Sequence, residues 1–444
     1  MTYEERLQNV SVLGAAGKMG SGIILLTALE MADLSLKPEH KGKTFVANAI
    51  DVSHEALAGL VKYLQTQVFK AAEKKMVQLR HFYSDRPELI ENSHIVDEYV
   101  RHVLGLIRPS VRLESAYDSL LVFEAIKEDP AVKNAVLSQI DRNNPNKPWY
   151  FTNTSSIPIS ELDEGAGLEG RIIGFHFYNP PAIQKLVEVI KGKHTLPELG
   201  DFALKYAKNM KKITVPSNDI AGFIGNGHFM RDLLFGISLA QRLSSEMPLH
   251  EAIFTVNKVT QDYLVRPMGI FQLMDYVGLD VCRYILSVMN PRIAGGSLHA
   301  PLLEEFTAKG VKGGQHADGS QKNGILQYDK GKITGVYCLT RDGYAHHNDF
   351  EERCNQRLGA MPEGTPAWKN AVRVSDKDSL FKPHFEKMKN QDSLGARLAV
   401  EYASESARIA RQLVTDGVAN QVEDVNTVLL TGFFHAYGPV NEYL

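Results

Sequence analysis

The side chains best suited to chemistry lie between residues 151 and 190. His176 follows a short apolar run at 172–175, and Glu188 stands twelve residues later inside a second apolar run at 186–190. Runs of this kind are typical of buried strands. A carboxylate in such a strand is costly to bury without a partner, and two neighbouring strands would bring the imidazole to it. The pair would fix the imidazole tautomer and leave one ring nitrogen able to act as a base.

Structural interpretations of the same residues stay open. A single histidine after an apolar strand is more often a satisfied structural residue, and Glu188 can pair with a lysine instead. The polar run at 153–156 can be only a turn or a helix cap. Considered one at a time, these residues do not assign a function.

The order of the polar motifs is more specific than any one of them. The motifs are Asn-Thr-Ser-Ser at 153–156, Gly-Phe-His-Phe-Tyr-Asn-Pro at 174–180, Lys-Leu-Val-Glu-Val-Ile at 185–190 and Gly-Phe-Ile-Gly-Asn at 222–226. In this order they closely resemble the L-3-hydroxyacyl-CoA dehydrogenase family, over about residues 9–340. The resemblance implies four catalytic residues, of which the last two would also bind substrate: His176, Glu188, Ser155 and Asn226.

A glycine-rich turn near the N-terminus has the context of a dinucleotide-binding loop. Apolar residues 10–13 predict a strand, helical periodicity follows to about residue 31, and Gly-Ala-Ala-Gly-Lys-Met-Gly at 14–20 joins the two. Glycines let the backbone turn tightly and approach a pyrophosphate at the helix N-terminus. The loop holds one residue more than the usual family version. We expect cofactor contacts at Gly14, Gly17, Lys18, Met19 and Gly20.

The second predicted strand, at 44–50, ends in Asp51. An acid at this place can accept the ribose hydroxyls of NAD and repels the 2′-phosphate of NADP. No arginine follows, so NAD is the expected cofactor. Asp51 lies 31 residues past Gly20, and the polar residues 35–43 predict an inserted loop that absorbs the excess. The alternative is that Asp51 only caps the helix beginning near Ser53.

The resemblance implies further contacts outside these motifs. Glu124, in a predicted strand, matches a glutamate that the family keeps beside cofactor and substrate, and Asn153 would contact the cofactor. Lys70 and Lys74 lie on a predicted helix that would approach the phosphates of CoA. For these lysines a solvated helical face is the default interpretation.

Periodicity divides the chain into three predicted parts. Alternating strands and helices at 1–215 predict an α/β Rossmann-type, doubly wound parallel sheet. Helical spacing dominates at 216–345, with a loop and short-strand region at 296–345, and the resemblance identifies this part as the family's helical C-terminal domain. Gly227 departs from the family, which usually has arginine there.

The last part, 346–444, carries signs of a second, degenerate copy of the helical domain. Val256-Asn257 is followed by Gly269 at the same interval as Val425-Asn426 is followed by Gly438. Both copies follow an amphipathic helix. The second copy lacks the Gly-Phe-Ile-x-Asn element, so we expect it to be structural.

Composition excludes several classes of protein. The 444 residues are 44% hydrophobic and 23% charged, with a net charge of −3, which gives no indication of a nucleic-acid partner. Three widely spaced cysteines suit a reducing compartment and form no metal-ligand pattern. The longest apolar run near the N-terminus is too short to span a bilayer, and no targeting segment is recognisable, so a cytoplasmic location without membrane contact is expected.

The predicted function is NAD-dependent, reversible oxidation of an L-3-hydroxyacyl-CoA to a 3-oxoacyl-CoA, in fatty-acid β-oxidation or related acyl-CoA metabolism. Two alternatives remain: a dehydrogenase of a free hydroxy acid, and a non-catalytic NAD-binding homologue. The expected assembly is a homodimer, or a monomer in which the second helical copy replaces the dimer contact. No crotonase-like stretch is present, so a hydratase partner would be a separate chain.

Overall fold

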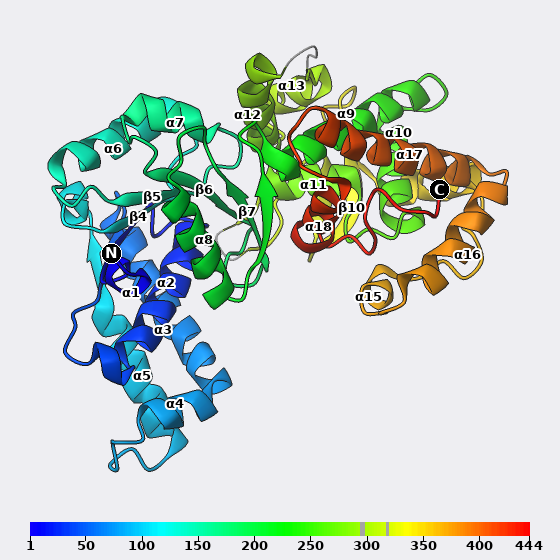
Figure 1. Ribbon diagram of the computed structural model, residues 1–444. Coiled ribbons are helices and arrows are strands. Elements are labelled where there is room, and N and C mark those ends of the chain that lie inside the picture. Colours follow the sequence, from blue (N-terminus) through cyan, green and yellow to red (C-terminus); the bar gives the residue numbers. More distant parts are fainter. Residues whose placement is uncertain (294–297, 317–318) are drawn as a thin grey trace. The chain divides into compact units, whose positions relative to one another are not determined.

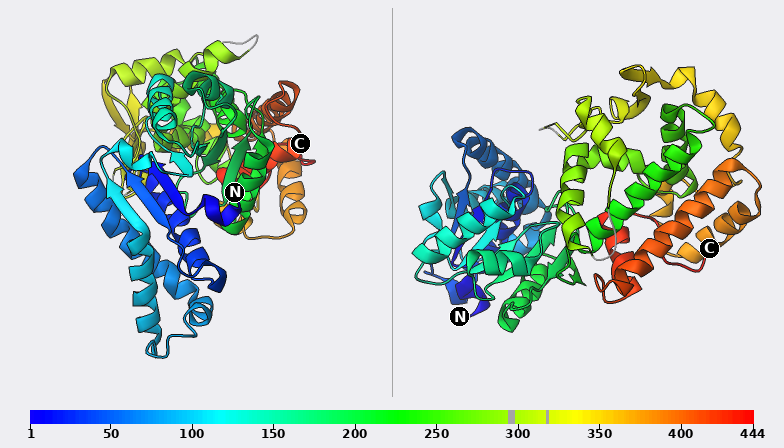
Figure 2. Two further views of the ribbon diagram at one scale, coloured as in Figure 1. Left: turned by 60° about the vertical axis from the view of Figure 1, so that its left-hand side comes forward. Right: turned by 90° about the horizontal axis from the view of Figure 1, so that it is seen from above.

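The structure is a computed structural model that describes residues 1–293, 298–316 and 319–444 (Figures 1 and 2). The chain forms two compact units, Met1–Asp219 and Ile220–Leu444. The boundary falls four residues beyond the predicted end of the nucleotide-binding part, and the predicted division at 345 stays a prediction. No helix in the described part of the chain has the length and apolar character needed to cross a membrane.

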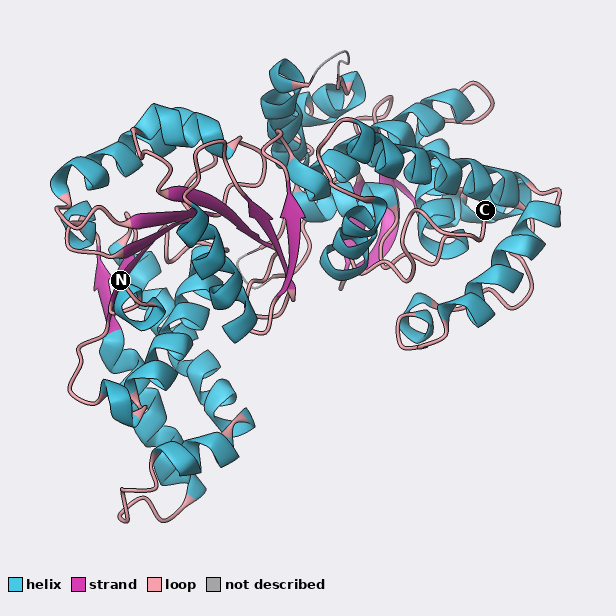
Figure 3. Ribbon diagram, viewed as in Figure 1, coloured by secondary structure: helices cyan, strands magenta, loops and turns pink. Residues whose placement is uncertain are grey.

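An eight-stranded sheet forms the centre of the first unit (Figure 3). Its spatial order is β3-β2-β1-β4-β5-β6-β7-β8, and all neighbours are parallel except β6 and β7. The strand order reverses between β1 and β4, which is where doubly wound sheets bind ligands. The predicted Rossmann-type sheet is therefore confirmed. The strands are β1 (Asn9–Leu13), β2 (Val46–Ile50), β3 (Ile107–Ser110), β4 (Leu121–Glu124), β5 (Trp149–Thr152), β6 (Ile172–Phe177), β7 (Leu186–Ile190) and β8 (Ile213–Ser217).

Helices cover both faces of this sheet (Figure 1). On one face lie α6 (Pro130–Asn143) and α7 (Ile159–Ala166), and on the other α2 (Gly20–Ser35), α3 (His54–Lys74), α5 (Asn92–Leu106) and α8 (Pro197–Asn209). Strands covered on both sides are apolar throughout, as β5 and β6 are. The short elements are α1 (Tyr3–Arg6), α4 (Met76–Phe82), and 3-10 turns at Pro38–His40 and Leu113–Ala116.

The second unit is mainly helical, and its described residues include a small antiparallel sheet in the order β11-β10-β9. This sheet lies where the sequence predicts loop and short strands, although residues 296–297 and 317–318 of that region lie outside the described residues. The elements are α9 (Phe223–Leu243), α10 (Leu249–Lys258), a π-helical turn (Val259–Tyr263), α11 (Ile270–Val277), α12 (Leu279–Met289), a 3-10 turn (Asn290–Arg292), α13 (Pro301–Ala308), β9 (Leu326–Asp329), β10 (Lys332–Cys338), β11 (Gly343–His346), a 3-10 turn (His347–Asp349), α14 (Glu351–Leu358), α15 (Trp368–Ala371), α16 (Lys377–Asn390), α17 (Leu394–Thr415) and α18 (Val422–Gly432).

Two helix pairs of this unit, α9–α10 and α17–α18, share an asparagine–glycine contact. In each pair an asparagine of the second helix, Asn257 or Asn426, lies against a glycine twelve residues later, Gly269 or Gly438. A Cβ atom on Gly269 would lie 2.4 Å from Asn257 Oδ1, and one on Gly438 would lie 2.5 Å from Asn426 Oδ1. In each pair the asparagine Oδ1 also accepts a backbone N–H from just beyond the glycine, at 3.0 and 3.1 Å. Only glycine allows the chain to approach the asparagine so closely.

The two segments agree in a second feature. Val265 and Phe434 each precede the contact glycine by four residues, and both adopt left-handed backbone angles, with φ of 51° and 55°. Such angles are uncommon for bulky residues. The long helices of the two pairs, α9 and α17, pack against each other.

Candidate active site

The strands β6 and β7 place His176 directly opposite Glu188 in their antiparallel ladder. The His176 Nδ1 atom lies 3.2 Å from Glu188 Oε1. An ionised carboxylate only accepts hydrogen bonds, so Nδ1 carries the proton and Nε2 is left as the basic nitrogen. Glu188 is completely buried, and His176 is 8% exposed at the carboxyl end of its strand. The structure therefore pairs His176 with Glu188, as the sequence predicted.

Tyr178 was not among the predicted site residues. Its hydroxyl donates to Glu188 Oε1 at 2.6 Å, and its ring lies 4.8 Å from the imidazole of His176. Burial, together with the Glu188 carboxylate, raises the pKa of Tyr178 well above its usual value, which keeps the phenol protonated as a donor. Tyr178 follows His176 by two positions, and this period places both on one face of the chain. That spacing was the available sequence signal.

The polar loop 153–156 leaves the carboxyl end of β5 and meets the histidine motif. Asn153 Oδ1 accepts the backbone N–H of Phe177 at 2.9 Å, which ties the loop to the residue after His176. The hydroxyl oxygens of Ser155 and Ser156 lie 3.3 Å apart. The structure therefore joins the first two predicted motifs. The contact of Asn153 with the cofactor stays a prediction.

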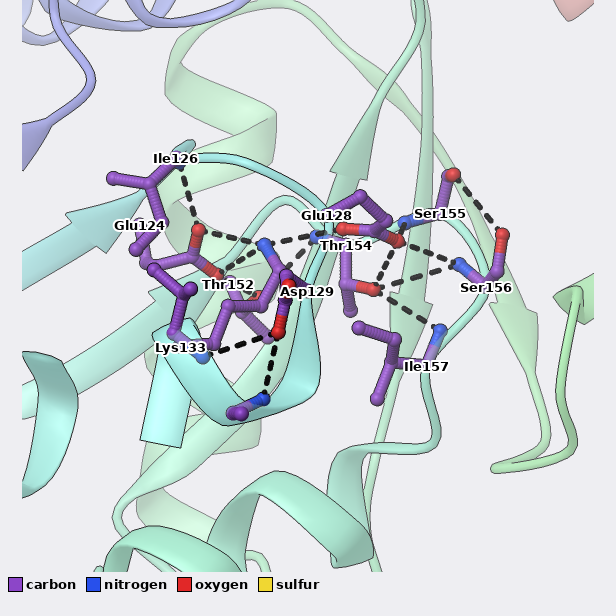
Figure 4. Close-up of polar contacts among 12 residues, drawn as sticks. Glu124, Ile126, Glu128, Asp129, Lys133, Thr152, Thr154, Ser155, Ser156 and Ile157 are labelled. Carbon is purple, nitrogen blue, oxygen red and sulfur yellow. Dashed lines mark hydrogen bonds and ion pairs between the residues drawn. The ribbon is translucent and has the colours of Figure 1, made fainter. Parts of the chain in front are cut away.

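A buried ammonium group, that of Lys133, lies between Glu124 and Glu128 (Figure 4). Lys133 Nζ donates to both carboxylate oxygens of Glu124, at 2.7 and 2.8 Å, and lies 3.1 Å from Glu128 Oε2. Burial by itself would lower the pKa of Lys133, but Glu124 and Glu128 hold it above its usual value. Glu124 is completely buried and also accepts the hydroxyl of Thr152 at 2.6 Å. Its predicted place beside the cofactor stays a prediction.

The other oxygen of Glu128 faces the loop. Glu128 Oε1 accepts the Thr154 hydroxyl at 2.6 Å and the backbone N–H groups of Ser155 and Ser156 at 2.9 and 3.2 Å (Figure 4). By the resemblance, Glu128 stands where the family places further cofactor-side residues, and that role stays a prediction. Its contacts with the loop and with Lys133 were not predicted. The contacts of Glu128 with the loop join residues at least 26 positions apart, whereas Lys133 lies nine residues after Glu124 and five after Glu128.

The glycine turn is built for close approach. Gly14 has a φ of 70°, and a Cβ there would lie 2.5 Å from the carbonyl oxygen of Ala125. A Cβ on Gly20 would lie 2.0 Å from the Gly14 carbonyl oxygen. Gly17 donates its N–H to that same oxygen at 3.0 Å, and α2 then begins without a side-chain cap. The turn leaves room for a pyrophosphate at the start of α2. Lys18 and Met19 lie within this turn.

Asp51 follows the carboxyl end of β2 and contacts the same turn. Its Oδ2 atom accepts the N–H of Ala16 at 3.0 Å, and its Oδ1 atom accepts the N–H of Val52 at 2.8 Å. The alternative in which Asp51 caps the next helix is wrong, because Ser53 is the N-cap of α3 and accepts the N–H of Ala56. The glycine turn and this carboxylate together fit NAD. Asp51 would accept the ribose hydroxyls, and the bound cofactor would supply the hydride acceptor.

Asn226 lies in the first turn of α9, in the second unit. The two residues that open this helix, Gly222 and Phe223, are both left-handed, with φ of 87° and 47°. A Cβ on Gly222 would lie 2.6 Å from the sulfur of Met289. The entry to α9 is therefore tightly constrained just before Asn226, and a strained residue of this kind is common near functional groups.

The departure at Gly227 has a local packing reason. A Cβ there would lie 3.2 Å from a methyl group of Leu413 in α17, so a larger residue would require the Leu413 side chain to shift. Arg231, one turn later, donates to the Gly227 carbonyl at 2.8 Å. The small residue thus accommodates the second helix pair.

Lys70 and Lys74 lie exposed in the last turns of α3. Lys70 is the seventeenth residue of α3, which places it about 25 Å along the helix axis from the cap at Ser53. Their contact with CoA phosphates stays a prediction.

The sheet, its switch point, the glycine turn and the acid after β2 together define an NAD-binding dehydrogenase. The sequence profile of the 3-hydroxyacyl-CoA dehydrogenase NAD binding domain matches residues 9–220, and that of the 3-hydroxyacyl-CoA dehydrogenase C-terminal domain matches residues 249–323. The chain belongs to the 3-hydroxyacyl-CoA dehydrogenase family. NAD as cofactor and the oxidoreductase class are thereby confirmed.

Individual relatives agree with this assignment. The chain is 30% identical to human mitochondrial hydroxyacyl-coenzyme A dehydrogenase, over 71% of this chain and 91% of the relative. It is 32% identical to a probable 3-hydroxybutyryl-CoA dehydrogenase of Bacillus subtilis, over 69% of this chain and 94% of the relative. The crystal structure of 3-hydroxybutyryl-CoA dehydrogenase from Escherichia coli shares the fold, with a TM-score of 0.63 and 19% identity over 98% of this chain and 90% of that chain.

Proposed function

We propose that this protein catalyses the NAD-dependent, reversible oxidation of an L-3-hydroxyacyl-CoA to a 3-oxoacyl-CoA. The observation that carries the proposal is the cross-strand pair of His176 and Glu188, in a chain of this family. The pair lies at the carboxyl edge of the sheet, where the glycine turn also lies. Ligands of doubly wound sheets bind at this edge.

His176 acts through its Nε2 atom, which takes the proton of the 3-hydroxyl group as C3 gives up its hydride. Glu188 accepts the Nδ1 proton at 3.2 Å, which orients the ring and stabilises the imidazolium that forms. Tyr178 donates to the same Glu188 oxygen and helps to hold it in place. In the reverse direction the imidazolium returns the proton to the 3-oxo group.

Ser155 and Asn226 are assigned to the substrate. Their hydroxyl and amide groups would hold the 3-oxygen and the thioester carbonyl, so that C3 is aligned with the cofactor. The placement of Ser155 beside the Asn153–Phe177 contact supports this role for the loop. Lys70 and Lys74 are assigned to the phosphates of CoA from the family resemblance, and their exposed positions on α3 allow such a contact.

The test is the oxidation of NADH by acetoacetyl-CoA, followed by absorbance, for the unmodified protein, His176→Ala and the control His194→Ala. His194 is an exposed histidine of the same unit. We expect His176→Ala to lose about 10²–10⁴ in rate while NAD binding is retained, and His194→Ala to keep full activity. A His176→Ala variant with near-normal turnover would contradict the assignment. Turnover of free 3-hydroxybutyrate without turnover of its CoA ester would favour the free-acid alternative.

The assembly is proposed to be a monomer in which α17 and α18 cover the surface that shorter relatives use for dimer contact. The packing of α17 on α9 and the contact of Leu413 with Gly227 support this arrangement. Light scattering should then give the mass of one chain, 49.4 kDa, and a mass of two chains would contradict it. A reducing compartment such as the cytoplasm is proposed because all three cysteines are buried and free.

A further inference from the structure

The loop that carries Ser155 is held by side chains. Four successive backbone N–H groups, those of residues 154–157, donate to oxygens of Thr152, Glu128 and Thr154 at 2.9–3.2 Å. The position of the Ser155 hydroxyl is therefore set by the groups that receive these bonds.

Glu128 is the central acceptor of this set. One of its oxygens receives the Thr154 hydroxyl and two consecutive backbone N–H groups, and the other lies 3.1 Å from Lys133 Nζ. Only an ionised carboxylate presents acceptors on both sides. An amide of the same shape would direct its NH₂ group either at the ammonium of Lys133 or at the three loop donors.

Lys133 connects Glu128 to the rigid sheet. Its side chain is 1% exposed, lies in the first turns of α6, and is gripped by both oxygens of Glu124 at the end of β4. Glu124 is in turn bonded to Thr152 on the neighbouring strand β5. A buried charge with this many partners has little freedom to move, because breaking one contact leaves another charge uncompensated.

We propose that Glu128 and Lys133 are positioning residues for the reaction: they act through the backbone of residues 154–156 to place the Ser155 hydroxyl against the substrate. This inference rests on the proposed function. It assigns Glu128 to the loop that holds the substrate, whereas a cofactor ligand would act on NAD binding. Displacing a substrate-aligning group by about 1 Å can cost about 10² in rate, so the arrangement has kinetic consequences without direct contact.

A double-mutant cycle tests this assignment with Glu128→Gln, Ser155→Ala and the combination of the two. The measured quantities are kcat and KM for acetoacetyl-CoA and the Kd of NADH from fluorescence titration. We expect Glu128→Gln to lower kcat about 10- to 100-fold with the NADH Kd changed less than about twofold. In the Ser155→Ala background the same change should lower kcat by no more than about twofold, because residues that act as one unit are not additive. The control Glu164→Gln, on an exposed position of α7, should leave all constants unchanged.

Each other outcome overturns the proposal. Multiplicative losses in the double variant would mean that Glu128 does not act through Ser155. A tenfold rise in the NADH Kd with an unchanged kcat would make Glu128 a cofactor ligand. If Glu128→Gln fails to fold, Thr154→Val removes one bond to Glu128 without a change of charge, and its cycle with Ser155→Ala must show the same non-additivity. An unmodified protein without turnover would refute the proposed function itself, which the cycle distinguishes from failure of the positioning role alone.

Discussion

The helix pairs α9–α10 and α17–α18 share a packing device and differ in the residues that open them. Each pair has the asparagine–glycine contact described above. In each, the residue four positions before the glycine, Val265 or Phe434, is left-handed. The pair α9–α10 is entered through Gly222 and Phe223, both left-handed, four and three residues before Asn226. The pair α17–α18 is entered through an ordinary cap, in which Ser393 accepts the N–H of Ala396 at 3.2 Å. The shared features fold the helices, and the strained entry belongs to the copy that carries a predicted catalytic group.

The two helix pairs are joined by buried polar contacts. Arg266, which follows the π-helical turn, donates to Asp232 of α9 at 2.9 Å and to the Ser406 hydroxyl of α17 at 3.2 Å. The Tyr402 hydroxyl reaches Asp232 from α17, at 3.2 Å from Oδ2. A buried ion pair of this kind favours one arrangement of the helices, because a different arrangement would leave the arginine or the aspartate without its partner.

The largest difference between the copies should appear in catalysis. Asn226→Ala is expected to lower kcat/KM for acetoacetyl-CoA about 10²–10³-fold, since it removes an amide that would polarise the thioester carbonyl. Asn426→Ala removes an asparagine of the second helix pair, where Asn226 has no counterpart, and should leave kcat/KM per folded molecule unchanged. Equal losses in both variants would remove the functional distinction between the copies.

A large loss of stability is expected for Arg266→Met. The change leaves the buried Asp232 carboxylate without its cation, which should cost about 3–5 kcal/mol of unfolding free energy. The control is Arg242→Met, which removes an exposed ion pair between α9 and Glu401 of α17 and should cost at most about 1 kcal/mol. Urea unfolding in a Trp149→Phe background reports the second unit alone, because Trp368 is then the remaining tryptophan. Equal costs for the two arginines would contradict a junction held by the buried pair.

A smaller and matched effect is expected from the two asparagines of the packing device. Asn257→Ala and Asn426→Ala each remove the acceptor of a backbone N–H, and each should cost about 1–3 kcal/mol in the same unfolding experiment. Costs that agree within about 1 kcal/mol would support equivalent devices. If only Asn426→Ala left the unfolding free energy unchanged, the Asn426–Gly438 contact would not stabilise the second helix pair.

The smallest effect should come from pH. His228 is 1% exposed and donates Nε2–H to the Ser406 carbonyl at 3.2 Å, and burial lowers its pKa. The folded state keeps this imidazole neutral while the unfolded chain binds a proton, so unfolding free energy falls as the pH drops below about 6.5. Urea midpoints at pH 7.5 and 5.5 should differ less for His228→Gln than for the unmodified protein. An unchanged difference would place the pH sensitivity elsewhere.

Much of the fold followed from apolar runs, because strands covered on both faces are apolar along their whole length. The His176–Glu188 pair followed from the cost of burying a carboxylate unpaired. The support by Glu128 and the contact of Leu413 with Gly227 did not follow, since both join residues distant in the chain. The role of Asp51 was ambiguous for a different reason: an acid after a strand and before a helix suits either a ribose or a helix cap, and only the geometry excludes the cap.

The direct opposition of His176 and Glu188 in the ladder affects how this protein can change in evolution. A single inserted or deleted residue within β6 or β7 would turn one partner to the opposite face of the sheet and destroy the pair. The connection at 179–185 lies outside the ladder, so its length can change while the register of the two strands is kept. Changes of length should therefore be tolerated in this connection more readily than in the strands beside it.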